Sequence, residues 1–334
     1  MSFLRNSVFK ILYHSGIGKN LLNRNRKKNR VPVLVFHKII PEYDQIWPGI
    51  HPQLFEKIII LLKKHYVILP LNALYLGDTP MVKLRNACFI TFDDGYKDFL
   101  DYAYPIMRKH KAFSSLFVLP YQLSNRGHIW TSTIIFFTKH YSFEEIDEFL
   151  KARKIHVNYR NKQDGFILNL DITVHLCAMK HRERMAIVND LRQKFIEDKR
   201  VIQNELLSFD ELRMLDPLLV DVESHSLTHP GFRNETNLGF IETELRESKE
   251  IIEKELNCKV HAFAFPFANF NDMSIDVAKQ IYQMSFTDIN DFVDLQKLQT
   301  EPAYKYNLPR FNIHHDSAEE VFFVINGFHK ALGY

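Results

Sequence analysis

Cysteine is scarce in this chain, and its spacing excludes the folds that rely on sulfur. Cys88, Cys177 and Cys258 lie far apart, and no C-x-x-C pair occurs. Disulfide frameworks and thiolate zinc sites both need cysteines that come in pairs. We therefore expect three reduced, buried thiols and a protein that resides in a reducing compartment.

Long apolar runs are absent as well. No segment approaches the roughly 18 consecutive apolar residues of a membrane-spanning helix. The first residues lack the continuous apolar stretch and the small-residue cleavage site of a signal peptide. Both absences favour a cytoplasmic location.

Neither sign of charge dominates. The 43 Lys and Arg residues exceed the 40 Asp and Glu residues by a net charge of +3, a surplus too small for a nucleic-acid-binding surface. Basic residues do gather in residues 1–30, where Val8, Ile11 and Leu12 recur near helical spacing. This basic amphipathic segment predicts either peripheral membrane contact or a solvated helix docked on the domain. Unchanged co-sedimentation with membranes after deletion of residues 1–28 would exclude the first alternative.

Residues 31–334 alternate apolar strand-like runs with helical patterns, which is typical of an α/β fold with a mainly parallel sheet or barrel. A hydrophobic share of 46% is enough for a large core, so we expect one domain. Strands are predicted at 31–37, 88–92, 114–119, 218–222, 260–265, 284–287 and 308–313. Helices are predicted at 52–65, 96–110, 208–215, 238–256, 274–282 and from 317 onward. Such folds carry their chemistry at the carboxyl ends of the strands.

Residues 121–207 interrupt this alternation with a polar, mostly helical stretch. Helices are predicted at 143–153 and 183–195, and no motif of known chemistry occurs. We interpret the stretch as an insertion that caps one face of the barrel. It either shapes substrate access or serves a purely structural role.

A first cluster of polar residues follows the strand predicted at 88–92. Asp93 and Asp94 come directly after it, and adjacent carboxylates raise one pKa unless a cation neutralises them. Gly95 then allows a tight turn. Because Asp-Asp-Gly is also common in ordinary turns, only its place at a strand end indicates a metal.

The second cluster contains His225 and His229, directly after the strand predicted at 218–222. Two histidines four residues apart lie on one face of a helical turn and can share one metal ion. With 16 histidines in 334 residues, about one such spacing is expected by chance. Both clusters nevertheless follow core strands, so we expect a carboxylate and two imidazoles to meet at one end of the barrel.

These clusters resemble motifs of the polysaccharide deacetylases, also known as carbohydrate esterase family 4 or NodB-homology enzymes. Thr91-Phe92-Asp93-Asp94-Gly95 is similar to the first family motif, and His225-Ser226-x-x-His229 to the second. The resemblance extends over about residues 31–315. It implies a distorted (β/α) barrel of the NodB-homology type, with residues 31–334 as the catalytic domain.

The resemblance also implies roles for single residues. Asp93 would be the general base, while Asp94, His225 and His229 would bind a divalent metal, usually zinc. The metal would polarise an acetyl carbonyl and activate a water, whose proton Asp93 would take. The products would be acetate and a sugar amine.

The third family motif, Arg-x-Pro-Tyr, reads here as Ala264-Phe265-Pro266-Phe267. The arginine that orients the base in the family is therefore missing. We expect Arg310, in the strand predicted at 308–313, to replace it. The backbone N–H of Phe267 is the best candidate for the donor to the oxyanion.

The general acid is open among three histidines. His314 and His315, just beyond the last predicted strand, and His37, at the end of the first, could each protonate the leaving amine, because an imidazole titrates in the right range. Each could equally be a structural or surface histidine. Trp130 and Tyr96 are the aromatic residues that we predict to contact sugar.

Together these assignments predict a zinc-dependent N-deacetylase. Its substrate would be an N-acetylated sugar, polymer or lipid-linked precursor in surface-glycan synthesis. Two alternatives are a metal-dependent hydrolase of another amide or an O-acetyl ester, and a non-catalytic glycan-binding module. The intact Asp93, Asp94, His225 and His229 argue against the module, since a binder needs no base beside a metal.

Overall fold

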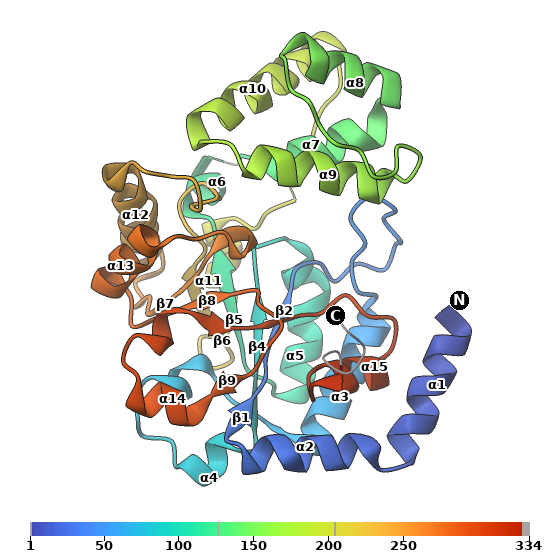
Figure 1. Cartoon of the computed structure of the whole chain (residues 1–334). Coiled ribbons are helices and arrows are strands. Elements are labelled where there is room, and N and C mark those ends of the chain that lie inside the picture. The colour runs from blue at the N-terminus through green and yellow to red at the C-terminus, as the bar shows by residue number, and fades with distance from the viewer. Residues whose placement is uncertain (1, 126, 204, 329–334) are drawn as a thin grey trace.

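A nearly closed barrel of parallel strands forms the centre of the molecule (Figure 1). The computed structural model describes residues 2–125, 127–203 and 205–328. Six strands lie side by side in chain order: β2 Val33–Phe36, β4 Ala87–Phe92, β5 Ser114–Val118, β6 Val220–Ser224, β7 Ala262–Ala264 and β8 Met284–Thr287. All neighbouring pairs are parallel. Most of these strands are buried on both faces, which explains why they read as unbroken apolar runs.

The segment 308–312 brings the two edges of this sheet together. Its first half, β10 Leu308–Pro309, pairs with β8, and its second half, β11 Phe311–Asn312, pairs with β2. The single strand predicted at 308–313 is therefore broken at Arg310, where the chain changes its pairing partner. The α/β barrel predicted from the sequence is confirmed.

Helices wrap the outside of the barrel. They are α3 Pro52–His65, α5 Tyr104–His110, α11 Phe209–Arg213, α12 Leu238–Leu256, α13 Asp272–Ile281, α14 Leu295–Thr300 and α15 Ala318–Val324. A π-helical turn, Phe99–Ala103, takes the first part of the helix predicted at 96–110. The predictions at 52–65 and 238–256 match the structure residue for residue.

Helix α3 shows why the match is close. The His51 side chain caps its first turn by accepting from the Gln53 N–H, and Pro52 has no N–H to satisfy. Its buried residues Phe55, Ile58, Ile59 and Leu62 follow helical spacing along one face. Strong end signals and a full apolar stripe fix both ends of such a helix.

Short elements were not predicted, because two to four residues carry no readable periodicity. They are β1 Arg30–Val31, β3 Val67–Ile68, η1 Leu71–Leu74, α4 Met81–Leu84, η3 Pro266–Ala268, β9 Val293–Asp294 and η4 Tyr304–Tyr306. Among them, β1 pairs antiparallel with β9, and β3 pairs with β4.

Between β5 and β6 the chain forms a layer of helices above the barrel, drawn in green in Figure 1. It contains α6 Pro120–Asn125, α7 Trp130–His140, α8 Phe143–Ala152, α9 Gly165–Cys177 and α10 His181–Glu197. Helices α8 and α10 correspond to those expected at 143–153 and 183–195. Helix α9 was not predicted: its sequence is apolar on most faces, so no amphipathic period marks it.

The basic N-terminal segment forms two helices, α1 Ser2–His14 and α2 Ile17–Lys27. Helix α1 packs against α15, with the rings of Phe9 and Phe323 5.7 Å apart, and Leu22 of α2 is buried in the main core. Val8 and Ile11 are exposed. The docked helix that the sequence allowed is present, and peripheral membrane contact stays a prediction. None of the helices in the described residues is long and apolar enough to cross a membrane.

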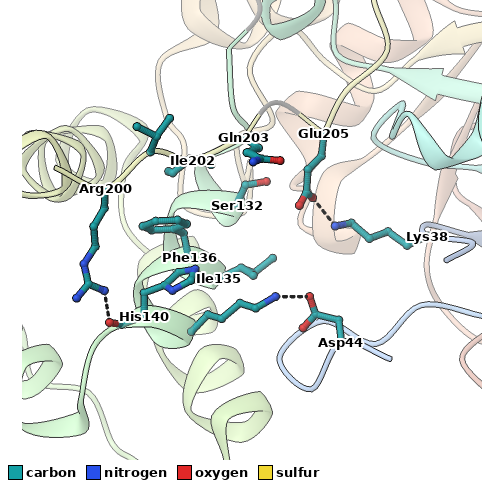
Figure 2. Close-up of a pocket in the computed structure, with 12 residues that line it drawn as sticks. Lys38, Asp44, Ser132, Ile135, Phe136, His140, Arg200, Ile202, Gln203 and Glu205 are labelled. Atoms are coloured by element: carbon teal, nitrogen blue, oxygen red, sulfur yellow. Dashed lines mark hydrogen bonds and ion pairs between the residues drawn. The ribbon is translucent and has the colours of Figure 1, made fainter. Parts of the chain in front are cut away.

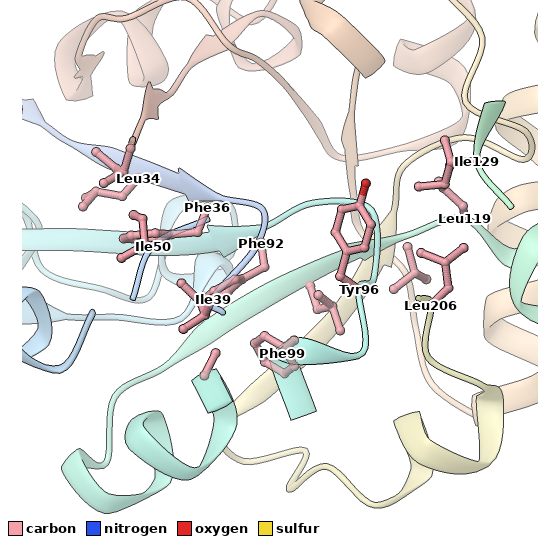
Figure 3. Close-up of a cluster of buried hydrophobic side chains, with 14 of the residues drawn as sticks. Leu34, Phe36, Ile39, Ile50, Phe92, Tyr96, Phe99, Leu119, Ile129 and Leu206 are labelled. Carbon is pink, nitrogen blue, oxygen red and sulfur yellow. The ribbon is translucent and has the colours of Figure 1, made fainter. Parts of the chain in front are cut away.

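Alternation along each strand divides the core in two. In β4, Cys88, Ile90 and Phe92 belong to the large cluster between the barrel and its helices, part of which Figure 3 shows. Ala87 and Phe89 belong to a second cluster, which fills the inside of the barrel. Because successive side chains point to opposite faces, every residue that continues the inner row beyond a strand opens onto the barrel mouth.

Candidate active site

Three charged residues continue the inner rows of three strands. Asp93 follows Phe89 and Thr91 of β4 in steps of two, Asp288 follows Phe286 of β8, and Arg310 lies two residues beyond Leu308. The guanidinium group of Arg310 lies over the rings of Phe117 and Phe286, at 5.4 and 5.9 Å. The period of two thus delivers all three charges to one place on top of the inner core.

Arg310 forms a bidentate salt bridge with Asp93. Its Nη1 donates to Asp93 Oδ1 at 2.8 Å, and its Nη2 donates to Asp93 Oδ2 at 2.6 Å. Nη2 also donates to Asp288 Oδ1 at 2.7 Å, and Nη1 to Thr91 Oγ1 at 3.2 Å. Both side chains of the Arg310–Asp93 pair are almost fully buried. This fork geometry fixes the plane of the Asp93 carboxylate.

Electrostatics keep Asp93 ionised. Burial alone would raise the pKa of Asp93, but the charges of Arg310 and His225 and the hydrogen bonds from Arg310 hold it below its ordinary value. Burial would likewise lower the pKa of Arg310, and Asp288 and Asp93 raise it. The buried carboxylate of Asp93 is therefore charged and oriented.

Asp94, His225 and His229 converge beside Asp93. Each offers one ligand atom, and these atoms lie within 4.8 Å of one another. Asp94 Oδ1 is 3.5 Å from His225 Nε2 and 3.3 Å from His229 Nε2. All three residues are buried. The structure thus brings together the three residues predicted as metal ligands.

Their hydrogen bonding fits a divalent cation. Asp94 Oδ1 is buried and has no hydrogen-bond partner among the described residues. His225 Nδ1 lies 2.9 Å from the carbonyl oxygen of Ala264, so Nδ1–H donates there and leaves the Nε2 lone pair toward Asp94. Two imidazoles and a carboxylate form a donor set typical of zinc.

The prediction that both histidines lie on a helical turn is wrong. Residues 225–229 form an irregular loop, because Ser226 and His229 have φ of 73° and 65°. The N–H groups of Leu227 and Thr228 donate to Glu244 Oε2 of α12, at 3.0 and 2.9 Å, instead of to the preceding turn. Burial raises the pKa of Glu244 to about 7.

Backbone strain gathers at this site. Ten non-glycine residues among those described have positive φ. Five of them lie at or just beyond helix ends, where that conformation is usual: Asn29, Lys111, Lys154, Lys199 and Asn257. The other five lie in the three loops at the metal site: Asp94, Ser226, His229, Phe267 and Ala268. Such conformations cost about 1–3 kcal/mol each and persist only where surrounding contacts impose them.

The third loop carries Phe267. Its ring packs on His229 at 4.5 Å and on Trp130 of α7 at 5.5 Å. Trp130 Nε1 donates to the carbonyl oxygen of His229 at 2.8 Å. The loop's own hydrogen bonds run from Ala268 N to Phe265 O and from Asn269 N to Pro266 O, so the turn does not use the Phe267 N–H.

The aromatic residues predicted to contact sugar are buried instead. Trp130 is 1% exposed and Tyr96 is 2% exposed, so neither offers a ring face to a ligand in this structure. Trp130 braces the His229 loop from the helical layer. Large aromatics close to a site are core far more often than platforms.

The three candidate acids lie at different depths. His37 follows β2, and its charge acts on both Asp93 and Asp94, lowering their pKa values. His314 is exposed and stacks on His315, with ring centroids 4.8 Å apart. Although part of His314 is exposed, partial desolvation by its neighbours lowers its pKa, and the charges of His37 and Arg5 lower it further. Of the three histidines, His37 is the one whose charge acts on both carboxylates in this way.

The chain is similar to known polysaccharide deacetylases. The family model for polysaccharide deacetylases matches residues 195–284, a segment that contains both histidines and the Ala264–Phe267 turn. The Streptococcus pyogenes deacetylase PplD, solved in complex with acetate, superposes with a TM-score of 0.57 and 16% identity, covering 89% of this chain and 98% of that one. The chain thus has the fold of polysaccharide deacetylases, and residues 195–284 match their family model.

Other polysaccharide deacetylase structures have the same fold. A polysaccharide deacetylase from Bacillus cereus matches with a TM-score of 0.57 and 21% identity over 89% of this chain and 69% of that one. IcaB from Ammonifex degensii matches with a TM-score of 0.56 and 12% identity over 90% and 98%. No curated protein sequence matches this chain.

Two residues of this site escaped the sequence-based prediction. Asp288 directly follows β8, and the strand-end rule that selected Asp93 would also have selected it. Glu244 lies on the buried stripe of α12 between Ile241 and Leu245, where an acidic residue among apolar ones is itself a signal.

We predict that the chain binds one Zn²⁺ ion and that His225→Ala and His229→Ala abolish tight binding. Loss of a hydrogen bond that supports a ligand typically weakens metal affinity about 10–100-fold, so loss of a ligand should cost at least as much. Isothermal titration calorimetry measures both stoichiometry and affinity. His156→Ala, at an exposed histidine, is the control.

The same titration tests the support from Glu244. Glu244→Ala should weaken Zn²⁺ binding about 10–100-fold, because the loop of residues 225–229 loses its acceptor. Glu244→Gln keeps an acceptor oxygen and should bind nearly as the wild type does. Equal affinity of the wild type and His225→Ala would show that the ion binds elsewhere.

Proposed function

We propose that this chain is a metal-dependent hydrolase that removes the N-acetyl group from an N-acetylated sugar. The observation that carries the proposal is a buried, arginine-held carboxylate, Asp93, directly beside the cluster of Asp94, His225 and His229. The match of residues 195–284 to the polysaccharide deacetylase family model supports carbohydrate deacetylation. We further propose Zn²⁺ as the ion and synthesis of a surface polysaccharide or glycan precursor as the setting.

Asp93 acts as the general base in this proposal. Arg310 keeps its carboxylate ionised and turned toward the site, so one oxygen can take a proton from the attacking water. When bound by Asp94, His225 and His229, a divalent ion supplies Lewis acidity for the acetyl carbonyl and for that water. The water oxygen then bonds to the carbonyl carbon.

The remaining steps concern the oxyanion and the amine. The backbone N–H of Phe267 is the proposed donor to the developing oxyanion, and the positive φ of this residue helps turn its N–H away from the hydrogen bonds of its own loop. Breakage of the C–N bond gives acetate and requires one proton on the leaving nitrogen. We infer that His37 delivers it, because the charge of His37 acts on both Asp93 and Asp94.

The first test is acetate release from N-acetylglucosamine oligomers. Wild-type protein with Zn²⁺ should release acetate, and a chelator should stop it. Asp93→Asn should lower kcat about 10²–10⁴-fold, the usual contribution of a general base. Arg310→Lys should lower kcat at least tenfold, because a lysine keeps the charge but cannot hold the carboxylate at both oxygens.

Controls separate catalysis from folding. Arg246→Gln, at an exposed arginine of α12, should leave kcat unchanged, and circular dichroism should show that every variant is folded. Acetate from O-acetyl esters alone would replace the N-deacetylase with an esterase. A folded, zinc-loaded chain that binds glycans but releases acetate from neither substrate class would be a binding module.

The second test concerns the acid. His37→Gln should lower kcat for N-acetyl sugars about 10²-fold or more, and should affect 4-nitrophenyl acetate far less, because nitrophenolate leaves without a proton. His314→Gln should leave both rates near the wild-type values. If His314→Gln rather than His37→Gln lowered kcat for the amide selectively, His314 would be the acid.

A further inference from the structure

A second concave feature lies beside the metal site. A pocket of about 670 Å³ is formed between α7, residues 200–203, Glu205 and the loop after β2 (Figure 2). Pockets of 300–1,000 Å³ are the usual size for small-molecule ligands. Lys38 and Asp44 line it from the barrel, and Ser132, Phe136 and Arg200 from the helical layer.

Backbone hydrogen bonds join this pocket to the metal-ligand loop. Lys97 N donates to Glu205 O at 2.7 Å, and Leu207 N donates to Gly95 O at 2.9 Å, so the pocket wall runs antiparallel to the residues that follow Asp94. On the other wall, Lys38 directly follows His37, and its ammonium lies 4.6 Å from the ring centre of Tyr96. A ligand in the pocket therefore lies next to the site that holds the scissile group.

The pocket carries an excess of positive charge. Two exposed ion pairs span it, Lys38 with Glu205 and Lys139 with Asp44, the latter at 3.1 Å (Figure 2). Arg200 is the third cation, and no described carboxylate forms an ion pair with it. Its guanidinium lies 4.3 Å from the ring centre of Tyr141 and donates to the carbonyl oxygen of His140.

The charge excess acts on a neighbouring imidazole. Burial lowers the pKa of His140, and the charges of Arg200 and Lys139 lower it further. The part of this shift that comes from Arg200 and Lys139 reflects a positive potential, which attracts an anion. Surface ion pairs contribute only about 0–1 kcal/mol, so both pairs can loosen when an anion arrives.

The pocket also offers contacts that suit a sugar ring. Phe136 is half-buried, and its ring packs on His140 at 4.3 Å. In Figure 2, Phe136 and His140 face Lys38, Glu205 and Asp44 across the pocket, with Ser132 and Gln203 between the two groups. An aromatic face next to hydroxyl, amide and charged groups matches the mixed apolar and polar surface of a saccharide.

We propose that this pocket binds an oxyanion-bearing unit of the glycan, a phosphate or a carboxylate, adjacent to the sugar that is deacetylated. The inference rests on the proposed function and narrows it to acidic or phosphorylated N-acetyl glycans. Arg200 and Lys139 are the specificity-determining residues. In this proposal the barrel site recognises the acetamide, and the pocket recognises the negative charge on the adjacent glycan unit.

Binding and turnover of three probes test the proposal. They are neutral tetra-N-acetylchitotetraose, di-N-acetylchitobiose 1-phosphate and a hyaluronan tetrasaccharide, whose uronic acids carry carboxylates. The wild type should bind at least one anionic probe roughly tenfold more tightly than the neutral one at low salt, and the preference should shrink as salt rises. The anionic probe that is preferred identifies phosphate or carboxylate as the group recognised.

Variants locate the preference. Arg200→Gln and the exposed Lys139→Gln should each raise KM for the anionic probe roughly tenfold, while kcat and the KM of the neutral probe stay unchanged. Arg246→Gln should change nothing. Thermal unfolding checks that Arg200→Gln is folded. If Arg200→Gln is not folded, Lys139→Gln alone tests the charge preference. Equal affinity for charged and neutral probes, or a preference that survives both substitutions, would overturn the proposal.

Titration calorimetry on Asp93→Asn protein separates the two proposals. Suppose that Asp93→Asn protein prefers anionic probes, that Lys139→Gln removes this preference, and that the wild type releases no acetate. The deacetylase proposal would then be refuted, and the proposed anion pocket would stand. Acetate release without any charge preference would do the reverse.

Discussion

The buried contact between Arg310 and its two carboxylates is the constraint on which this structure depends. Arg310 is fully buried, and the free-energy cost of burying its charge is offset only while Asp93 and Asp288 both remain in place. The same residue stands where the closing segment stops pairing with β8 and begins to pair with β2. The residue at which the barrel closes is thus also the residue that orients the proposed base.

The loops around this contact are held from outside the barrel. The backbone of four site residues has a positive φ, a conformation that residues other than glycine rarely adopt: Asp94, Ser226, His229 and Phe267. Contacts from three directions impose these conformations: Glu244 of α12 holds the histidine loop, Trp130 of α7 bonds to His229, and residues 205–207 pair with 95–97. Since two of these supports belong to the inserted segment or its return to the barrel, the helical layer contributes to the precision of the site.

How much the sequence predicts follows from the range over which each signal acts. Helix α3 could be placed residue for residue because its cap and apolar stripe are local. The metal cluster could be predicted because strand ends meet at one barrel mouth, and Arg310 because Ala264 left a cation missing. The helical turn predicted at His225 is wrong because the N–H groups of Leu227 and Thr228 donate to Glu244. That contact joins residues distant in sequence, so the local pattern does not reveal it. Trp130 was misassigned because burial by α10 and Phe267 depends on tertiary packing.

The charges of the whole cleft form one arrangement. Asp93, Asp94 and Asp288 carry three negative charges against the single positive charge of Arg310, and imidazoles that ligate a metal are neutral. The deficit of two equals the charge of a divalent cation, so one such ion would balance the site. Next to it, Lys38, Lys139 and Arg200 outnumber Asp44 and Glu205. A glycan with an acidic unit beside its acetamido sugar can satisfy that excess only when the acidic unit lies on the pocket side of the acetamide. Charge could therefore set the direction in which a substrate lies in the cleft.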